Sequence, residues 1–244
     1  MSPPLLETFP REEWRRNRLR YEPSQGITII GAPGTGKTHL AFDMAEVITS
    51  PDNPFLMLVK KPRDKLIETR GKAMGLRRLD RWPPPAWHRL AGAKPRGWLV
   101  WPETNYSDIK ASNAHKANVF RAAILDTYKR GHRLMFTDDA YGLSEILKLR
   151  LEMIEAWTEF RSQPAGFMSA FQRAAGVPLW SYQAEHLCLF KETDKQGRRR
   201  FAEIGGVDPD LLAWHNQRLL QHQFLHVTRT GGPGGGPSVC IVDR

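Results

Sequence analysis

The sequence predicts an α/β fold with a mostly parallel central sheet and helices on both faces. Three observations predict it. Segments rich in β-branched and aromatic residues alternate with segments of helical pattern along most of the chain. A glycine-rich loop joins the first strong strand to a helix, as in a strand–loop–helix unit. The chain has 244 residues, 41% of them hydrophobic, which is enough to bury the core of one large domain.

The strand pattern begins after residue 25. The expected strands are Ile27–Ile30, Phe55–Val59, Trp98–Trp101, Leu134–Thr137, Gly166–Phe171, His186–Phe190, Phe224–Thr228 and Val239–Val242. The expected helices are Thr38–Ile48, Pro62–Met74, Ala114–Lys129, Leu143–Phe160 and Pro209–His222. Helical connections between strands imply right-handed crossovers and parallel neighbours, although some of the late strands could be antiparallel additions.

Composition divides the chain into three parts. Residues 1–25 are rich in Pro and Arg and form a basic arm, with a short helix plausible over Arg11–Leu19. This arm either touches a neighbouring subunit or DNA, or it is a solvated helix. Residues 26–230 form the core, interrupted at about 75–97 by an insertion rich in Arg, Trp and Pro. Residues 231–244 are a glycine-rich loop and a terminal strand.

Residues 31–38 read Gly-Ala-Pro-Gly-Thr-Gly-Lys-Thr, a complete phosphate-binding loop between a strand and a helix. Its glycines let the backbone curl around an oxyanion, and the N–H groups at the helix start favour negative charge. Lys37 supplies a cation for the β- and γ-phosphates, and Thr38 offers its hydroxyl to Mg²⁺. The expected nucleotide-binding residues are Gly31, Gly34, Thr35, Gly36, Lys37, Thr38 and His39.

A pair of carboxylates, Asp138 and Asp139, follows the strand Leu134–Thr137. In a parallel sheet the end of this strand lies at the same edge as the phosphate-binding loop. We expect Asp138 to organise Mg²⁺, acting through water, and Asp139 to polarise an attacking water as general base. A solvated turn or a helix cap is the alternative for an isolated Asp pair.

The segment Asp138-Asp139-Ala140-Tyr141 resembles the Walker B motif of the additional-strand P-loop ATPases. The later segment, from Phe160-Arg161-Ser162 through Phe171-Gln172-Arg173 to Val177-Pro178, is similar in order to the FtsK–HerA superfamily, which includes phage DNA-packaging ATPases and Zot-like proteins. This resemblance spans roughly residues 25–229. It implies a RecA-like P-loop NTPase core that binds ATP and Mg²⁺.

The resemblance also implies two catalytic side chains outside the motifs. Gln172 falls where the family has its polar sensor, and Arg161 falls near the family's arginine before that strand, which can act as a finger on the γ-phosphate. A capping amide and a surface ion pair are the structural alternatives for these two residues. Asp139 departs from the family, which usually carries Glu there, so the carboxylate of this chain is one methylene shorter.

The formal net charge is +10, which suits a polyanionic partner such as double-stranded DNA, although a GC-rich genome could also enrich Arg. Two basic clusters could contact it. One interleaves Arg77, Arg78, Arg81 and Arg89 with Trp82 and Trp87. The other contains Lys191, Lys195, Arg198, Arg199 and Arg200 around Gln196-Gly197, where we expect a hairpin tip. A solvated face is the usual role of such charge runs.

Three functions fit this pattern. We expect first an ATP-hydrolysing motor that translocates or packages double-stranded DNA, as a homo-oligomeric ring of phage or plasmid origin. A viral portal or capsid vertex is the candidate docking partner of such a ring. A nucleotide-gated DNA-binding switch with weak hydrolysis and a small-molecule kinase are the alternatives.

The apolar runs are too short for a membrane span, and the two cysteines show no disulfide or metal spacing. A cytoplasmic location without a membrane partner is therefore expected.

Overall fold

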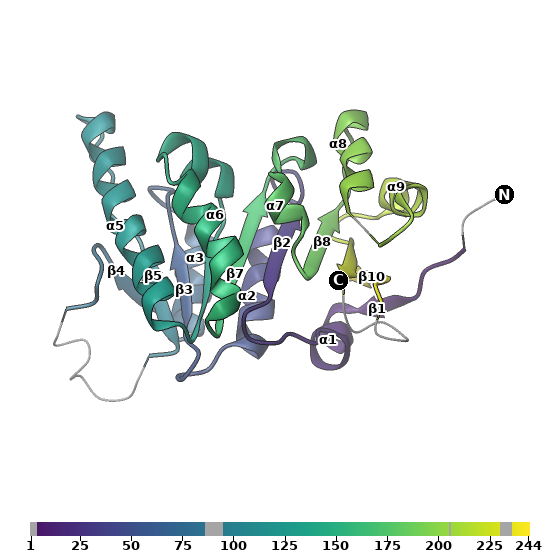
Figure 1. The fold of residues 1–244 in the computed structure, drawn as a ribbon, viewed down its shortest axis with the longest axis horizontal. Helices are drawn as coiled ribbons and strands as arrows, with labels where there is room; N and C mark the ends of the chain where they lie inside the picture. The colour runs from purple at the N-terminus through teal and green to yellow at the C-terminus, as the bar shows by residue number, and fades with distance from the viewer. Residues whose placement is uncertain (1–3, 86–94, 205, 230–235) are drawn as a thin grey trace.

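The computed structural model describes residues 4–85, 95–204, 206–229 and 236–244, except the side chain of Arg161. Within these residues one sheet has ten strands in the order β1-β10-β9-β8-β2-β7-β6-β3-β5-β4 (Figure 1). The strands are β1 Thr8–Pro10, β2 Gly26–Ile30, β3 Phe55–Leu58, β4 Arg77–Leu79, β5 Gly97–Val100, β6 Arg133–Thr137, β7 Ala165–Phe171, β8 His186–Phe190, β9 Phe224–Thr228 and β10 Ser238–Asp243. The short edge strands β1 and β4 were not expected from the sequence.

Seven neighbouring strands, from β8 to β4, are parallel. Strand β9 is antiparallel to both β8 and β10, so the expectation of late antiparallel strands is confirmed. Strand β7 lies between β2, which leads into the phosphate-binding loop, and β6, which leads into the aspartate pair. The predicted α/β class is therefore confirmed, and one strand separates the two strands that carry the motifs.

Helices cover both faces of the sheet. They are α1 Arg11–Glu13, α2 Lys37–Ile48, α3 Lys65–Ala73, α5 Ile109–Arg130, α6 Arg150–Glu159, α7 Leu179–Tyr182, α8 Lys195–Arg199 and α9 Pro209–Arg218. Figure 1 shows α5, α6 and α7 on one face and α2 and α3 on the other. None of the helices in the described part of the chain combines the length and the apolar character needed to cross a bilayer.

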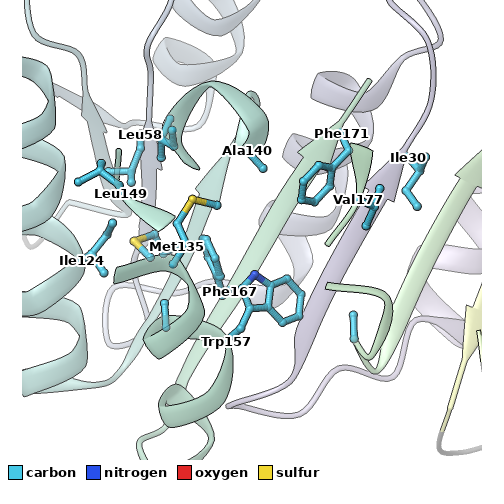
Figure 2. Close-up of a cluster of buried hydrophobic side chains, with 14 of the residues drawn as sticks. Ile30, Leu58, Ile124, Met135, Ala140, Leu149, Trp157, Phe167, Phe171 and Val177 are labelled. Carbon is cyan, nitrogen blue, oxygen red and sulfur yellow. The ribbon is translucent and has the colours of Figure 1, made fainter. Parts of the chain in front are cut away.

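Alternating residues of β2 serve two separate cores. Ile27 and Ile29 pack on the side of α2 and α3, whereas Ile30 packs in the cluster under α5 and α6, shown in Figure 2. Thr28 also faces that second side, where its hydroxyl donates a hydrogen bond of 2.7 Å to the carbonyl of Ser181. Both cores hold the strand in place, so the loop that follows it starts from a fixed point.

Several helix boundaries differ from the sequence prediction for local reasons. Helix α3 begins at Lys65 rather than Pro62, because the Asp64 carboxylate accepts the N–H groups of Leu66 and Ile67. The helix expected over Leu143–Phe160 is divided into a π-helical turn, Gly142–Ile146, and α6. Lys148, between them, has a φ of 58° that ends the first piece.

The first described residues fold onto the core. Strand β1 pairs with β10, and the expected helix over Arg11–Leu19 is present as α1 followed by a π-helical turn, Trp14–Arg18. Trp14 is fully buried. Arg15 donates to the Glu46 carboxylate of α2 at 3.0 Å, so charge as well as apolar burial fixes this segment.

The structure describes one of the two basic clusters completely and the other in part. Residues 86–94, with Trp87 and Arg89, lie outside the described residues, as do residues 230–235 of the glycine-rich loop. Trp82 is buried, and its Nε1 donates to Asp126 at 3.2 Å. The hairpin expected around Gln196-Gly197 is wrong: this segment is helix α8, capped by the Asp194 carboxylate, which accepts the N–H groups of Gln196 and Gly197.

A directed chain of hydrogen bonds joins the N-terminal segment to β8 and β9. The indole Nε1 of Trp14, which can only donate, lies 2.9 Å from Nδ1 of His226. His226 must therefore carry its proton on Nε2 and donate it to Nδ1 of His186, 3.2 Å away. Nε2 of His186 in turn donates to Oε1 of Gln25 at 2.9 Å. Both imidazoles are buried and neutral in this pattern.

Because of this chain, the free energy of unfolding should fall as the pH is lowered from about 6.5 to about 5. Burial lowers the pKa of His186 to about 4 and that of His226 well below its ordinary value. The unfolded state then binds more protons in this range, so stability is complete above the unfolded pKa and decreases below it. Each histidine can contribute up to about 1.4 kcal/mol per pH unit.

Urea unfolding between pH 7.5 and pH 5 checks this. The amide of His186→Gln can accept and donate hydrogen bonds in the place of the imidazole, but it does not titrate. This variant should therefore reduce the change of unfolding free energy per pH unit by about half. His115→Gln, at an exposed position on α5, should leave the slope unchanged. Equal slopes in the two variants would contradict the assignment.

Candidate active site

The loops that follow β2, β3, β6 and β7 meet at the carboxyl edge of the sheet around a cavity of about 560 Å³. Ligand sites in proteins commonly have this size. Its lining brings together the phosphate-binding loop, Asp138 and Gln172, as the sequence predicted. The lining residues are Arg11, Pro33, Gly34, Gly36, Lys37, Thr38, His39, Lys61, Leu66, Asp138, Gln172, His222 and Arg244.

The phosphate-binding loop depends on its glycines. Gly34 and Gly36 have φ values of 81° and 104°, in the region that side-chain-bearing residues rarely adopt. A Cβ on Gly31 would lie 2.7 Å from Cβ of Phe190 and 2.7 Å from Oγ1 of Thr35. The loop therefore packs directly on β8, and helix α2 starts immediately after Gly36 with its N–H groups at the cavity.

Lys37 projects from the start of α2 back over the loop. Its Nζ donates to the carbonyl oxygens of Gly31, at 2.6 Å, and Ala32, at 2.9 Å. Burial, with repulsion from the ammonium of Lys61, lowers the pKa of Lys37 to about 8. Thr38 is half-buried and His39 is exposed, and both line the cavity. Of the predicted loop residues, Gly31 and Thr35 contribute to the fold of the loop without lining the cavity.

Asp138 is a buried carboxylate at the cavity wall. Its side chain is only 1% exposed, and apart from one ion pair neither oxygen has a polar partner among the described residues. The ammonium of Lys61 lies 2.7 Å from Oδ2 as its counter-ion. Burial raises the pKa of Asp138, and the positive charge of Lys61 opposes that rise.

Asp139 is engaged elsewhere and is not among the residues that line the cavity. Its Oδ2 lies 3.1 Å from Nζ of Lys60, and its Oδ1 accepts the N–H of Gly142 at 2.9 Å. The carboxylate thus caps the π-helical turn that follows β6, which is the structural alternative that an Asp pair after a strand always leaves open.

The remaining two predicted residues come from the ends of β7. Gln172 directly follows β7, is exposed and lines the cavity. Arg161 lies in the 3₁₀ turn Phe160–Ser162 that precedes β7, and its side chain is outside the described part of the structure. The strand begins and ends at opposite edges of the sheet, so the backbone of Arg161 is on the edge away from the cavity.

Among the cavity residues that the sequence reasoning missed are Lys61, Arg11 and His222. Lys61 is the third residue after β3, at the same edge of the sheet as Asp138, and that position after a strand was a usable signal. Arg11 and His222 had no such signal. The guanidinium of Arg11 donates to the carbonyl of His222 at 3.0 Å, and Nδ1 of His222 donates to the carbonyl of Thr35 at 3.1 Å. The N-terminal segment is thereby linked to the phosphate-binding loop.

Comparison with solved structures gives the same architecture. The DNA-packaging ATPase B204 of Sulfolobus turreted icosahedral virus superimposes with a TM-score of 0.62 and 14% identity, over 92% of this chain and 100% of that one. The genome-packaging NTPase B204 of Sulfolobus turreted icosahedral virus 2 is similar both in complex with ATP-gammaS (TM-score 0.59, 14% identity, 90% of this chain and 98% of that one) and with AMPPCP (TM-score 0.57, 14% identity, the same shares).

No protein-family model matches the chain, and no curated protein matches it by sequence. At 14% identity the likeness concerns the fold alone, and this fold is the one that the resemblance of the motifs implied. The chain has the P-loop NTPase fold that these viral genome-packaging ATPases share.

Proposed function

We propose that the chain is an ATP-hydrolysing motor that translocates or packages double-stranded DNA. The observation that carries this proposal is the meeting of Lys37, Asp138 and Gln172 around one cavity at the carboxyl edge of the sheet. The similar fold of B204, an enzyme described as a DNA-packaging ATPase, supports the choice among P-loop functions. The net charge of +10 suits the DNA partner.

The site residues fit a nucleotide with Mg²⁺. Asp138 has two buried carboxylate oxygens whose one partner among the described residues is the ammonium of Lys61, and the Thr38 hydroxyl lines the same cavity. Oxygen ligands of this kind are those that Mg²⁺ prefers. The ion, when bound, would neutralise charge on the β- and γ-phosphates. The N–H groups at the start of α2 and the ammonium of Lys37 would bind the phosphates, and Gln172 would orient the attacking water.

The motor is proposed to work as a homo-oligomeric ring, in a viral or plasmid context, with a portal or capsid vertex as a possible docking partner. The position of Arg161 supports this arrangement, because the backbone that carries it lies at the sheet edge away from its own cavity. In a ring, Arg161 would serve as a finger for a neighbouring subunit, where a guanidinium would stabilise the charge that develops on the γ-phosphate.

A nucleotide-gated switch with weak hydrolysis is the second candidate. It is favoured by one observation: the carboxylate of Asp139 is held by Lys60 and by the N–H of Gly142, beside the cavity and not in its lining. A carboxylate in that position needs a rearrangement before it can polarise a water molecule over the γ-phosphate.

Lys37→Ala should abolish nucleotide binding, because the ammonium that contacts the β- and γ-phosphates is lost. Isothermal titration with ATP and Mg²⁺ measures this, and a loss of at least about tenfold in affinity is expected. Lys129→Ala, an exposed lysine at the far end of α5, should bind like the unchanged protein. Retained binding in Lys37→Ala would remove the basis of the proposal.

Replacement of Asp139 separates the two candidates. For a motor, Asp139→Asn should reduce DNA-stimulated turnover by about a hundredfold or more while ATP affinity stays nearly unchanged. A steady-state phosphate-release assay with and without DNA gives both quantities. Unstimulated, slow turnover in the unchanged protein, with a large increase in Asp139→Glu, would favour the switch instead.

The exposed cations of α8 should carry part of the DNA contact. Lys191, Arg198 and Arg200 donate hydrogen bonds to backbone carbonyls, whereas Lys195 and Arg199 are exposed. The double variant Lys195→Gln with Arg199→Gln should weaken DNA binding and lower the salt slope of log K by about two. Nucleotide affinity should be unaffected. An unchanged salt slope would exclude α8 from the DNA contact.

A further inference from the structure

Two consecutive lysines after β3 face the two consecutive aspartates after β6. The register pairs Leu58 with Thr137, so the chain continues past both strand ends side by side. Nζ of Lys60 lies 3.1 Å from Asp139, and Nζ of Lys61 lies 2.7 Å from Asp138. Each acid of the pair therefore has its own lysine, contributed by the neighbouring strand.

The two pairs differ in what else holds the acid. Asp139 also accepts a backbone N–H, and its side chain is 21% exposed. Asp138 is buried, and among the described residues its oxygens have no polar partner besides Lys61. An ionised carboxylate in that position is costly unless a cation neutralises it. Lys61 is thus the counter-ion on which the charge of Asp138 depends.

Lys61 has a second anion within reach. Its Nζ lies 3.2 Å from Oδ2 of Asp64, whose other oxygen caps helix α3. The lysine side chain is 43% exposed and lines the cavity together with Lys37. The ammonium can therefore leave Asp138 and keep an ionic partner, while its positive charge remains at the wall of the cavity.

We propose that Lys61 is a positioning residue that holds Asp138 ready at the cavity and competes with Mg²⁺ for its carboxylate. The inference rests on the proposed function for the presence of Mg²⁺ with the nucleotide. An ammonium 2.7 Å from Oδ2 keeps the water shell of a metal ion away from that oxygen, so Lys61 and Mg²⁺ exclude each other at Oδ2, and the neutralised charge weakens the pull of Oδ1 on the ion as well. Lys61 then keeps Asp64 as its partner and adds positive charge beside the phosphates.

Competition between Lys61 and Mg²⁺ affects which form of the metal ion the cavity binds. Mg²⁺ alone meets a carboxylate that is already neutralised, whereas Mg²⁺ bound to a nucleoside triphosphate brings phosphate oxygens that can attract the released ammonium. The site should therefore prefer the metal–nucleotide complex to the free ion. Removal of the ammonium should make Asp138 more available to Mg²⁺ and, without the metal, more costly to bury.

The first experiment measures urea unfolding at one neutral pH in EDTA, without nucleotide. Lys61→Met should raise the equilibrium constant for unfolding by about tenfold, between the effects of an exposed and a buried pair. On an Asp138→Asn background the same substitution should change it by less than about twofold, since the neutral amide needs no counter-ion. Lys60→Met is the matched control, and its effect should not depend on residue 138. Equal effects of Lys61→Met on both backgrounds would overturn the proposal.

The second experiment titrates Mg²⁺ against the binding of a fluorescent ATP analogue. Lys61→Met should lower the half-saturating Mg²⁺ concentration by about fivefold, and Lys60→Met should leave it within about twofold. An unchanged or higher value in Lys61→Met would overturn the competition. If the unchanged protein binds no nucleotide, the proposed function fails by that result alone. The unfolding data still decide whether Lys61 neutralises Asp138, and equal effects on the two backgrounds would reject its role.

Discussion

Parallel register is the constraint on which the rest of this structure depends. Strands β2, β7, β6 and β3 are neighbours that run in one direction, so their carboxyl ends form one edge. The phosphate-binding loop, Gln172, Asp138 and Lys61 are the residues that follow these ends. A shift of β6 by one residue relative to its neighbours would turn its buried side chains to the wrong face, so the packing of both cores also fixes the position of the acids.

The fold class and most of the cavity could be predicted from sequence because they depend on local signals. A glycine pattern with fixed spacing identifies the loop, and an apolar strand that ends in carboxylates identifies Asp138. The edge strands β1 and β4 escaped prediction because three residues are too short for a periodic pattern. The hairpin expected near Gln196 is a helix because the Asp194 cap outweighs the turn propensity of glycine.

The tertiary partners of the site could not be predicted in this way. Lys61 and Asp138 are far apart in the chain, and only the register of β3 against β6 brings them together. Arg11 reaches the cavity because the buried side chain of Trp14 holds this segment on the core, and no sequence pattern around Arg11 predicts that burial. The capping of Gly142 by Asp139 is another such case, because the same Asp pair suits either a cap or a general base.

Both edge strands of the sheet are short. At one side the last strand is β1, three residues that end in Pro10, and at the other it is β4, three residues that include Arg77 and Arg78. Short strands with proline or charge discourage another chain from adding its own backbone to a sheet. The sheet of the described residues is therefore poorly suited to continue into the sheet of a second copy of the chain, and any contact between copies would fall to the side chains of helices and loops.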